Sequence, residues 1–304
     1  MNSKAIVTLA DANYFNLLLE LINSIKSHKE SKDISICILD AGLDSDQINI
    51  LKTKVYSIKK AKWDIPVPGF KTINKEWLKS QVSRAFLPNY FPEFKKYLWI
   101  DCDAWVNSWL AVDLYFRACD NGKLGITQSI GPGYRIMSKV KWLLGKVAVI
   151  KSQNYKHAKA SGIEDEIARK LAFAPHINIG VFSLEKHSKC WDVWQKNLKK
   201  TLSKGKIFGS EGLAINIAVY HDNVDVEFLP LKCNWITSHL LPKYDTEKQT
   251  FVEPFLPNEK IGIIHLAAGI WENKKDMRLH KDVKIKIKTL QGNEINKSLR
   301  FGIK

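Results

Sequence analysis

The sequence predicts a single α/β domain with a mostly parallel central sheet and flanking helices. Short apolar segments alternate along the 304 residues with segments whose apolar residues recur every three or four positions, which is the pattern of strands connected by helices. The run Tyr97-Leu98-Trp99-Ile100 is continuously apolar, as is typical of a strand buried on both faces of such a sheet. Polar residues directly follow several predicted strands, at the end of the sheet where this fold class binds ligands.

The predicted strands have alternating or continuous apolar residues. They cover residues 6–9, 34–38, 97–100, 124–127, 177–184, 224–228 and 261–264. The predicted helices have apolar residues at helical spacing, and Pro88 is expected to stop the third of them. They cover residues 15–25, 46–51, 77–87 and 191–198. Trp191 and Trp194 belong to the last helix, and their spacing favours burial in the core.

Two regions fit this alternation less well. Residues 131–175 form a long basic stretch with several glycine turn signals, and Met137, Val140, Leu144 and Val147 within it have rough helical spacing. Residues 274–304 are also basic, and isoleucines and valine alternate with lysines at 283–288, which predicts an edge strand protected by lysines. We therefore predict one domain over residues 1–273, with an insertion at 131–175 and a basic C-terminal extension at 274–304.

Composition limits the class of protein. Hydrophobic residues make up 45% of the chain, so a large core can form and global disorder is excluded. Five widely spaced cysteines predict reduced thiols rather than a disulfide framework. Neither a signal peptide nor an apolar run of membrane-spanning length is evident. These features predict a cytoplasmic protein, either free or peripheral at the inner face of the membrane.

The net charge of +16 indicates either an anionic partner or a purely solubilising lysine-rich surface. Anionic lipid and phosphorylated substrates are the candidate partners. Nucleic acid is not expected, because the sequence has no motif of the usual nucleic-acid-binding kinds.

Asp101 and Asp103 are the first candidates for chemistry. They follow the apolar run 97–100 and, two residues apart in an extended chain, point to the same side. His265 follows the last predicted strand in the same way. Carboxylates and an imidazole can hold a divalent cation such as Mg²⁺ or Mn²⁺, and such an ion can neutralise a diphosphate. The alternative is a solvated turn with two acids and a histidine that makes an ordinary hydrogen bond.

Six segments, in order, resemble motifs of glycosyltransferase family 8, the retaining enzymes that include glycogenin and the galactosyl- and glucosyltransferases of lipopolysaccharide assembly. They are Ala10 to Tyr14, Ser83 to Pro88, Tyr97 to Asp103, Asn178 to Val181, Glu211 to Asn216 and Ile264 to Gly269. The resemblance covers residues 5–130 and 175–275 in pieces. It implies a GT-A fold, which is a single Rossmann-like domain, and a UDP-sugar donor bound with a divalent metal.

The resemblance also implies roles for individual residues. The implied metal ligands, for Mn²⁺ or Mg²⁺, are Asp101, Asp103 and His265. The implied donor-binding residues are Asp11, Asn13, Tyr14, Arg84, Asp101 and Lys274. The implied catalytic residues, which would line the sugar and face its developing positive charge, are Asn178 and Glu211.

The sequence departs from the family pattern in four places. Glu211-Gly212 stands where the family has Asp-Gln, so the family's glutamine is absent, which favours same-face displacement without a protein nucleophile. Gly269 comes one residue later after His265 than usual. The family's Lys-Pro-Trp is not reproduced, so Lys274 and Lys275 are alternative substitutes for its lysine. Gln128 stands where many members have an acidic residue, so the donor-sugar preference of family members cannot be assigned to this sequence.

Structural roles stay open for the same residues. Asp11 and Asn13 are also typical helix caps, Asn178 is also a typical turn residue, and Arg84 is also a typical surface charge. Trp235 and Trp271, in predicted loops, are candidates for stacking on a sugar or base.

We expect a metal-dependent retaining hexosyltransferase that acts on a glycan or other hydroxyl acceptor, in the assembly of surface polysaccharide or lipopolysaccharide. Residues 131–175 would lie on the acceptor side, and the basic regions would face an anionic acceptor or membrane. A nucleotidyltransferase or phosphotransferase would want a glycine-rich phosphate loop, and the sequence contains no convincing one. A catalytically degenerate nucleotide- or glycan-binding protein of the same fold is the second alternative.

Overall fold

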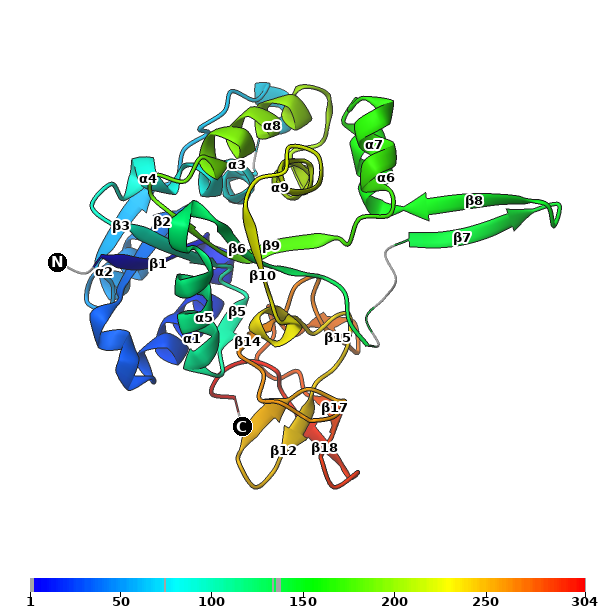
Figure 1. Ribbon diagram of the computed structural model, residues 1–304. Helices are drawn as coiled ribbons and strands as arrows, with labels where there is room; N and C mark the ends of the chain where they lie inside the picture. The colour runs from blue at the N-terminus through cyan, green and yellow to red at the C-terminus, as the bar shows by residue number, and fades with distance from the viewer. Residues whose placement is uncertain (1–2, 74, 133, 135–137, 304) are drawn as a thin grey trace.

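A computed structural model describes residues 3–73, 75–132, 134 and 138–303 and has a seven-stranded sheet at its centre (Figure 1). The strand order is β10-β6-β9-β4-β1-β2-β3. All neighbouring strands are parallel except β9, which runs antiparallel to both β4 and β6. The strands are β1 (Lys4–Ala10), β2 (Ser35–Asp40), β3 (Ser57–Lys60), β4 (Lys96–Ile100), β6 (Leu124–Gln128), β9 (Ile177–Glu185) and β10 (Val226–Leu229). The predicted α/β class with a mostly parallel sheet is confirmed.

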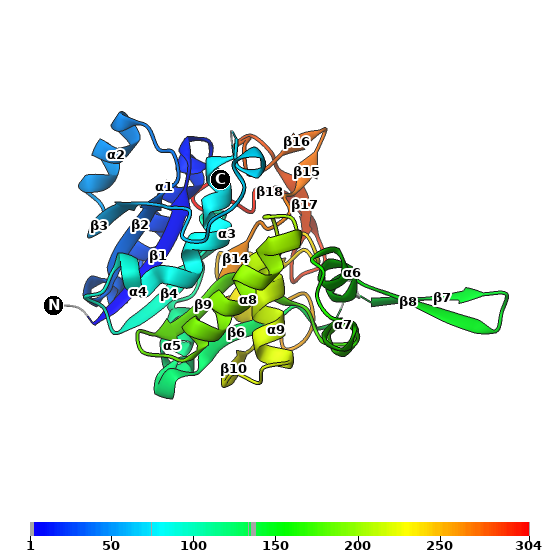
Figure 2. The same ribbon diagram turned by 90° about the horizontal axis from the view of Figure 1, so that it is seen from above.

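Helices cover both faces of this sheet, as the view from above shows (Figure 2). Alternation along β4 explains the two layers: Tyr97 and Trp99 enter one hydrophobic core, and Leu98 and Ile100 enter the other. The first core includes residues of α3, α4, α8 and α9, and the second includes residues of α1 and α5. The helices are α1 (Phe15–Lys26), α2 (Ser45–Lys52), α3 (Ser80–Ser83), α4 (Leu87–Tyr90), α5 (Trp109–Ala118), α6 (Gln153–Ala160), α7 (Asp165–Leu171), α8 (Cys190–Lys204) and α9 (Ser210–Tyr220).

The predicted helix at 77–87 is a series of short turns rather than one helix. Two 3₁₀ turns, Glu76–Lys79 and Arg84–Phe86, alternate with α3 and α4. The prediction that Pro88 stops the helix was wrong, because Pro88 lies in the first turn of α4. Proline is tolerated there because the first N–H groups of a helix have no intrahelical partner.

The predicted strand at 261–264 belongs to a second, smaller sheet of order β11-β14-β5. Its strands are β5 (Ala104–Val106), β11 (Trp235–Ile236) and β14 (Ile263–His265). β14 runs antiparallel to β5 and pairs His265 with Ala104. This pairing places His265 beside the turn that follows β4.

Residues 131–175 contain a β-hairpin, formed by β7 (Ser138–Leu143) and β8 (Val147–Ser152), followed by α6 and α7. The helical spacing at Val140, Leu144 and Val147 was misleading, and Met137 lies outside the described residues. Apolar residues and lysines alternate from 139 to 142, and this period of two is the one that the backbone follows.

The C-terminal region folds back onto the domain. Met277, Ile285 and Leu299 share a hydrophobic core with Trp105 and Ile264. The predicted lysine-protected strand is confirmed in β17, where isoleucines are buried and lysines exposed. The strands of this region are β12 (Lys243–Asp245), β13 (Thr250–Val252), β15 (Trp271–Glu272), β16 (Lys275–Asp276), β17 (Ile285–Lys288) and β18 (Glu294–Lys297).

Candidate functional site

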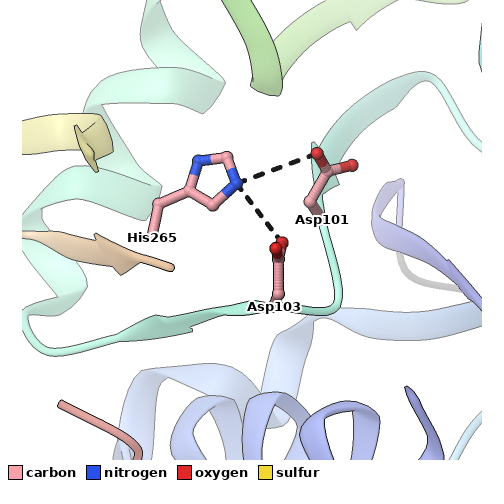
Figure 3. Close-up of side chains that lie close together, drawn as sticks. All are labelled: Asp101, Asp103 and His265. Atoms are coloured by element: carbon pink, nitrogen blue, oxygen red, sulfur yellow. Dashed lines mark ion pairs between the residues drawn. The ribbon is translucent and has the colours of Figure 1, made fainter. Parts of the chain in front are cut away.

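Asp101 and Asp103 lie in the turn between β4 and β5, and the β5–β14 pairing brings His265 to them (Figure 3). Nε2 of His265 is 3.3 Å from Oδ1 of Asp103 and 3.9 Å from Oδ2 of Asp101. One ligand atom from each of the three residues lies within 4.8 Å of the other two. Two carboxylate oxygens and one imidazole nitrogen are a suitable donor set for Mn²⁺ or Mg²⁺.

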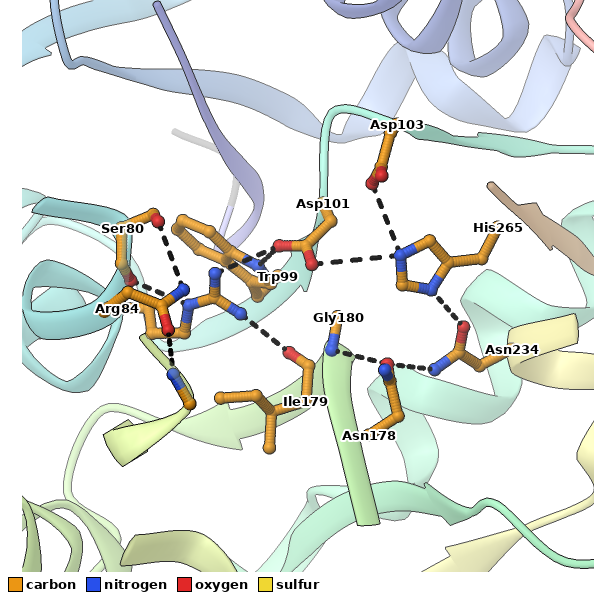
Figure 4. A network of polar contacts seen from close by, with 12 residues as sticks. Ser80, Arg84, Trp99, Asp101, Asp103, Asn178, Ile179, Gly180, Asn234 and His265 are labelled. Atoms are coloured by element: carbon orange, nitrogen blue, oxygen red, sulfur yellow. Dashed lines mark hydrogen bonds and ion pairs between the residues drawn. The ribbon is translucent and has the colours of Figure 1, made fainter. Parts of the chain in front are cut away.

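Arg84 is a buried residue that holds Asp101 (Figure 4). Its guanidinium donates to the carbonyl oxygens of Ser80 and Ile179, and its third nitrogen lies 3.3 Å from Oδ1 of Asp101. The indole N–H of Trp99 donates to the same oxygen at 2.7 Å, and the guanidinium lies over the Trp99 ring. Arg84 is therefore not a surface charge. Its donors are used inside the protein, which makes it a positioning residue for Asp101.

His265 is oriented from its other side by Asn234, which the sequence did not single out. Nδ1 of His265 lies 2.9 Å from Oδ1 of Asn234, and the amide nitrogen of Asn234 donates to Oδ1 of Asn178 at 3.2 Å. The N–H of Gly180 also donates to that oxygen. An Nδ1–H that donates to Asn234 leaves Nε2 free to face the carboxylates (Figure 4).

The pKa values of Asp101, Asp103 and His265 depend on one another because the three side chains lie close together. Burial raises the pKa of Asp101. Burial would also raise the pKa of Asp103, but His265 and Arg278 outweigh it and the pKa is lowered. Burial would lower the pKa of His265, but the hydrogen bond and charge of Asp103 raise it. The two carboxylates thus favour a proton on His265, and a cation bound by the three residues would compete with that proton.

Tyr14 and Asp11, both predicted to bind the donor, have different surroundings. Tyr14 lines the cavity beside the aspartates, and burial raises the pKa of its hydroxyl to about 12. Asp11 instead accepts backbone N–H bonds from Asn13 and Tyr14 and caps the short turn Ala12–Tyr14. The structural role of Asp11 as a cap is therefore present, and it fixes the backbone that carries Tyr14.

Of the basic residues Lys274 and Arg278, which follow His265 in the chain, Arg278 lines the cavity and Lys274 does not. Lys274 lies exposed in the turn between β15 and β16 and does not line the cavity. Arg278 lines it, pairs with the buried Asp276 at 2.7 Å and lies 3.7 Å from Oδ2 of Asp103. Local sequence patterns do not show which of the basic residues after His265 turns toward the cavity, so this arginine could not be selected.

Asp101, Asp103 and His265 lie in the wall of a cavity of about 680 Å³. The central sheet and its adjoining turns contribute Asp101, Asn178 and Tyr14. The region 131–175 contributes Asn154 and His157 from α6. This volume is in the range of cavities that bind small-molecule ligands.

Glu211 lies in the first turn of α9 and lines the same cavity. Its side chain is buried, and its Oε2 has no hydrogen-bond partner among the described residues. Burial raises the pKa of this carboxyl to about 7, although Arg84 acts in the opposite direction. One oxygen of this buried carboxyl is thus an acceptor without a partner among the described residues, in a residue that lines the cavity.

The tryptophans for which the sequence predicted a role are partly buried in the core and partly exposed. Trp191 and Trp194 are buried core residues, as predicted, and Trp235 is also buried, so its proposed role in stacking on a ligand was wrong. Trp271 is exposed beside a neighbouring hollow. Gln128 donates to the Tyr220 hydroxyl at 2.9 Å.

Comparison with known proteins identifies the class of enzyme. The family model described as "Glycosyl transferase family 8" matches residues 5–122, which include Tyr14, Arg84, Asp101 and Asp103. Over these residues the chain is similar to family 8 glycosyltransferases, and this match supports assignment as a glycosyltransferase. No curated protein matches this glycosyltransferase in a sequence search.

Solved glycosyltransferase structures show that the chain has the GT-A fold. The galactosyltransferase LgtC, in complex with donor and acceptor sugar analogs, is 14% identical, with a TM-score of 0.52 and coverage of 87% of each chain. The bifunctional glycosyltransferase WbbM is 17% identical, with a TM-score of 0.54 over 91% of this chain and 48% of its own. GlyE of Streptococcus pneumoniae TIGR4 is 15% identical, with a TM-score of 0.51 over 90% of this chain and 56% of its own.

None of the helices in the described part of this glycosyltransferase combines the length and apolar character that crossing a bilayer requires.

Proposed function

We propose that the enzyme transfers a hexose from a UDP-sugar to a hydroxyl group of a glycan acceptor, with retention of the anomeric configuration. The observation that carries this proposal is the cluster of Asp101, Asp103 and His265 in the wall of the cavity. The bound Mn²⁺ or Mg²⁺ would neutralise the diphosphate as it leaves. The family assignment supports a nucleotide-sugar donor, and the donor set of the three residues fits a divalent cation.

The chain's own residues would do four things around that donor. Tyr14 would contact the nucleoside, since it lines the cavity next to the turn capped by Asp11. Arg278 would donate to a phosphate oxygen while Asp276 keeps its guanidinium in place. Asn178 would contact the sugar. Arg84 would keep Asp101 aimed at the cation site.

Glu211 would stabilise the positive charge that develops on the sugar, because it lines the cavity and one of its carboxyl oxygens has no partner among the described residues. Gly212, at the position of the family's glutamine, has no side chain to act as a nucleophile. The acceptor oxygen would therefore bond to the anomeric carbon on the face from which the diphosphate departs. The hydroxyl proton would pass to a phosphate oxygen of the leaving group.

Hydrolysis of a panel of UDP-sugars, with Mn²⁺ and with EDTA, tests the proposal. We expect turnover of at least one donor with Mn²⁺ and none with EDTA. Asp103→Asn should abolish turnover, whereas Asp113→Asn, at an exposed position on α5, should retain it. Equal turnover by the two variants would contradict the metal assignment. Failure of every UDP-sugar to bind or react would contradict the donor class.

A further inference from the structure

The hairpin of β7 and β8 projects away from the body of the enzyme (Figures 1 and 2). Its two strands pair with each other in register from Ser138 and Ser152 to Leu143 and Val147. An isolated two-stranded hairpin is at best marginally stable in water, because it has no core of its own. An element of this kind is expected to have a partner.

The outer end of the hairpin exposes large apolar side chains. Leu144 is 98% exposed and Trp142 is 64% exposed. Val140, Leu143 and Val147 are exposed as well. Contiguous apolar side chains at the end of a projection are unusual for a surface that meets only water.

The backbone at the tip reinforces this exposure. Lys146 N–H donates to the Leu143 carbonyl, and both residues between them have positive φ, Leu144 at 50° and Gly145 at 67°. Such tight turns favour asparagine or aspartate before glycine. A leucine in this left-handed conformation is unfavourable, and here it places a large apolar side chain at the outermost point of the hairpin.

Charge on the hairpin indicates the kind of partner. Lys139, Lys141 and Lys146 are all exposed. Alternation places Val140 and Trp142 on one face of β7 and the two strand lysines on the other. Lysines that alternate with these apolar side chains along β7, with Lys146 in the tip itself, match a bilayer surface, because a lysine can keep its ammonium group at the anionic headgroups while apolar side chains reach the acyl chains.

We infer that the tip of this hairpin, Trp142 to Val147, inserts into the surface of an anionic lipid bilayer. The inference extends the proposed function, because it also places the acceptor. β8 ends at Ser152 and α6 begins at Gln153, and Asn154 and His157 of α6 line the cavity. A bilayer at the hairpin thus lies on the side of the cavity that α6 forms. The acceptor class that fits is a glycan carried on a lipid.

Flotation with lipid vesicles tests the inference and needs no turnover. The full chain should bind vesicles of phosphatidylcholine with phosphatidylglycerol and bind pure phosphatidylcholine vesicles more weakly. Trp142→Ser with Leu144→Ser leaves the charge unchanged and should weaken binding to the mixed vesicles by about tenfold or more, since burial of each side chain contributes to the partition constant. Ile50→Ser with Leu110→Ser, which removes two exposed apolar side chains on α2 and α5, should bind like the wild type.

Two further measurements separate the competing outcomes. Hydrolysis of a soluble UDP-sugar should be unchanged in the Trp142→Ser/Leu144→Ser variant, so loss of vesicle binding with intact hydrolysis supports the inference independently of the proposed function. Vesicle binding equal to wild type in that variant would show that the surface lysines alone bind lipid and would overturn insertion of the tip. Sedimentation without lipid that reveals a dimer abolished by the same substitutions would assign the hairpin to a second copy instead.

Discussion

The backbone of Gly180 lies directly against the imidazole of His265. A Cβ atom at position 180 would overlap Cε1 of His265 and lie 2.8 Å from Oδ2 of Asp101. The carbonyl of Gly180 also accepts the N–H of Asp101 at 2.7 Å. β9 can therefore approach two of the proposed metal ligands, Asp101 and His265, only because residue 180 has no side chain.

Gly180→Ala should disrupt the metal site more than the fold. The added methyl group must displace His265 or Asp101, and overpacking of this kind typically costs about 1–3 kcal/mol. Titration calorimetry with Mn²⁺ and UDP should show weaker metal binding, while circular dichroism stays that of a folded protein. Gly69→Ala is the matched control, since a Cβ atom there meets no atom within 4 Å. Equal metal affinity in both variants would mean that the imidazole is not a ligand.

Asn234→Ala should lower metal affinity by about 10- to 100-fold, which is the usual effect of removing a partner that orients a ligating histidine. Asn234→Asp keeps an oxygen that can accept from Nδ1 of His265, so it should bind Mn²⁺ more tightly than the alanine variant. Titration calorimetry should therefore rank the Mn²⁺ affinities of the wild type, the aspartate variant and the alanine variant. An alanine variant with wild-type affinity would show that Asn234 does not fix the imidazole.

Arg278→Gln should raise the KM for the UDP-sugar by roughly tenfold or more, because a charge-assisted hydrogen bond to phosphate is worth about 1.5–3 kcal/mol. Lys274→Gln should change KM little, since Lys274 is exposed in a turn outside the cavity. The two variants carry the same charge change four residues apart. Initial rates over a range of donor concentrations distinguish them, and the reverse ranking would restore Lys274 as the phosphate contact.

Glu211 should make the metal-free enzyme less stable as the pH rises. Its pKa is about 7 in the folded protein against an ordinary value of 4.5, so between these values the folded state holds a proton that the unfolded state releases. Stability is therefore lost as the pH rises through this window, by about 3 kcal/mol in total. Above pH 7 the folded protein must bury a carboxylate.

Glu211→Gln has no charge to bury and should remove most of that loss. Urea unfolding in EDTA at several pH values measures the difference between the variant and the wild type, which should grow from acidic to neutral pH. Glu247→Gln, at an exposed position, should follow the wild type. A constant difference between Glu211→Gln and the wild type across the range would contradict the raised pKa.

The sequence was sufficient to predict the central sheet and to select three residues, Asp101, Asp103 and His265, that the structure brings together. A continuous apolar run predicts β4. Asp101 and Asp103 are then selected because they come directly after that strand. His265 was selected because it follows a predicted strand, but that pattern does not explain why it lies beside the aspartates. It reaches the aspartates because β14 pairs antiparallel with β5 in a separate sheet, and strand pairing between such distant segments leaves no local signal.

Other parts of the site depend on packing that local patterns do not encode. Arg278 faces the cavity because Asp276 and the core around Met277 fix its backbone, and charge alone did not separate it from the neighbouring lysines. Asn234 has no distinguishing neighbours in the sequence. The hairpin at 138–152 was misjudged because apolar residues at 140, 144 and 147 satisfy a helical period while their neighbours satisfy a strand period.

The pairing of β14 with β5 also has a consequence for the order of events during synthesis. Asp101 and Asp103 belong to the first half of the chain, but Ile264 beside His265 shares its core with Met277 and Leu299. Arg300 then pairs with Glu20 of α1 at 2.6 Å. During synthesis, the segments that form the central sheet therefore leave the ribosome before the residues that pack around β14. A chain truncated after His265 would contain Asp101, Asp103 and His265 but would lack Met277 and Leu299, which pack in the same core as Ile264. We expect such a chain to hold His265 less firmly against the two aspartates.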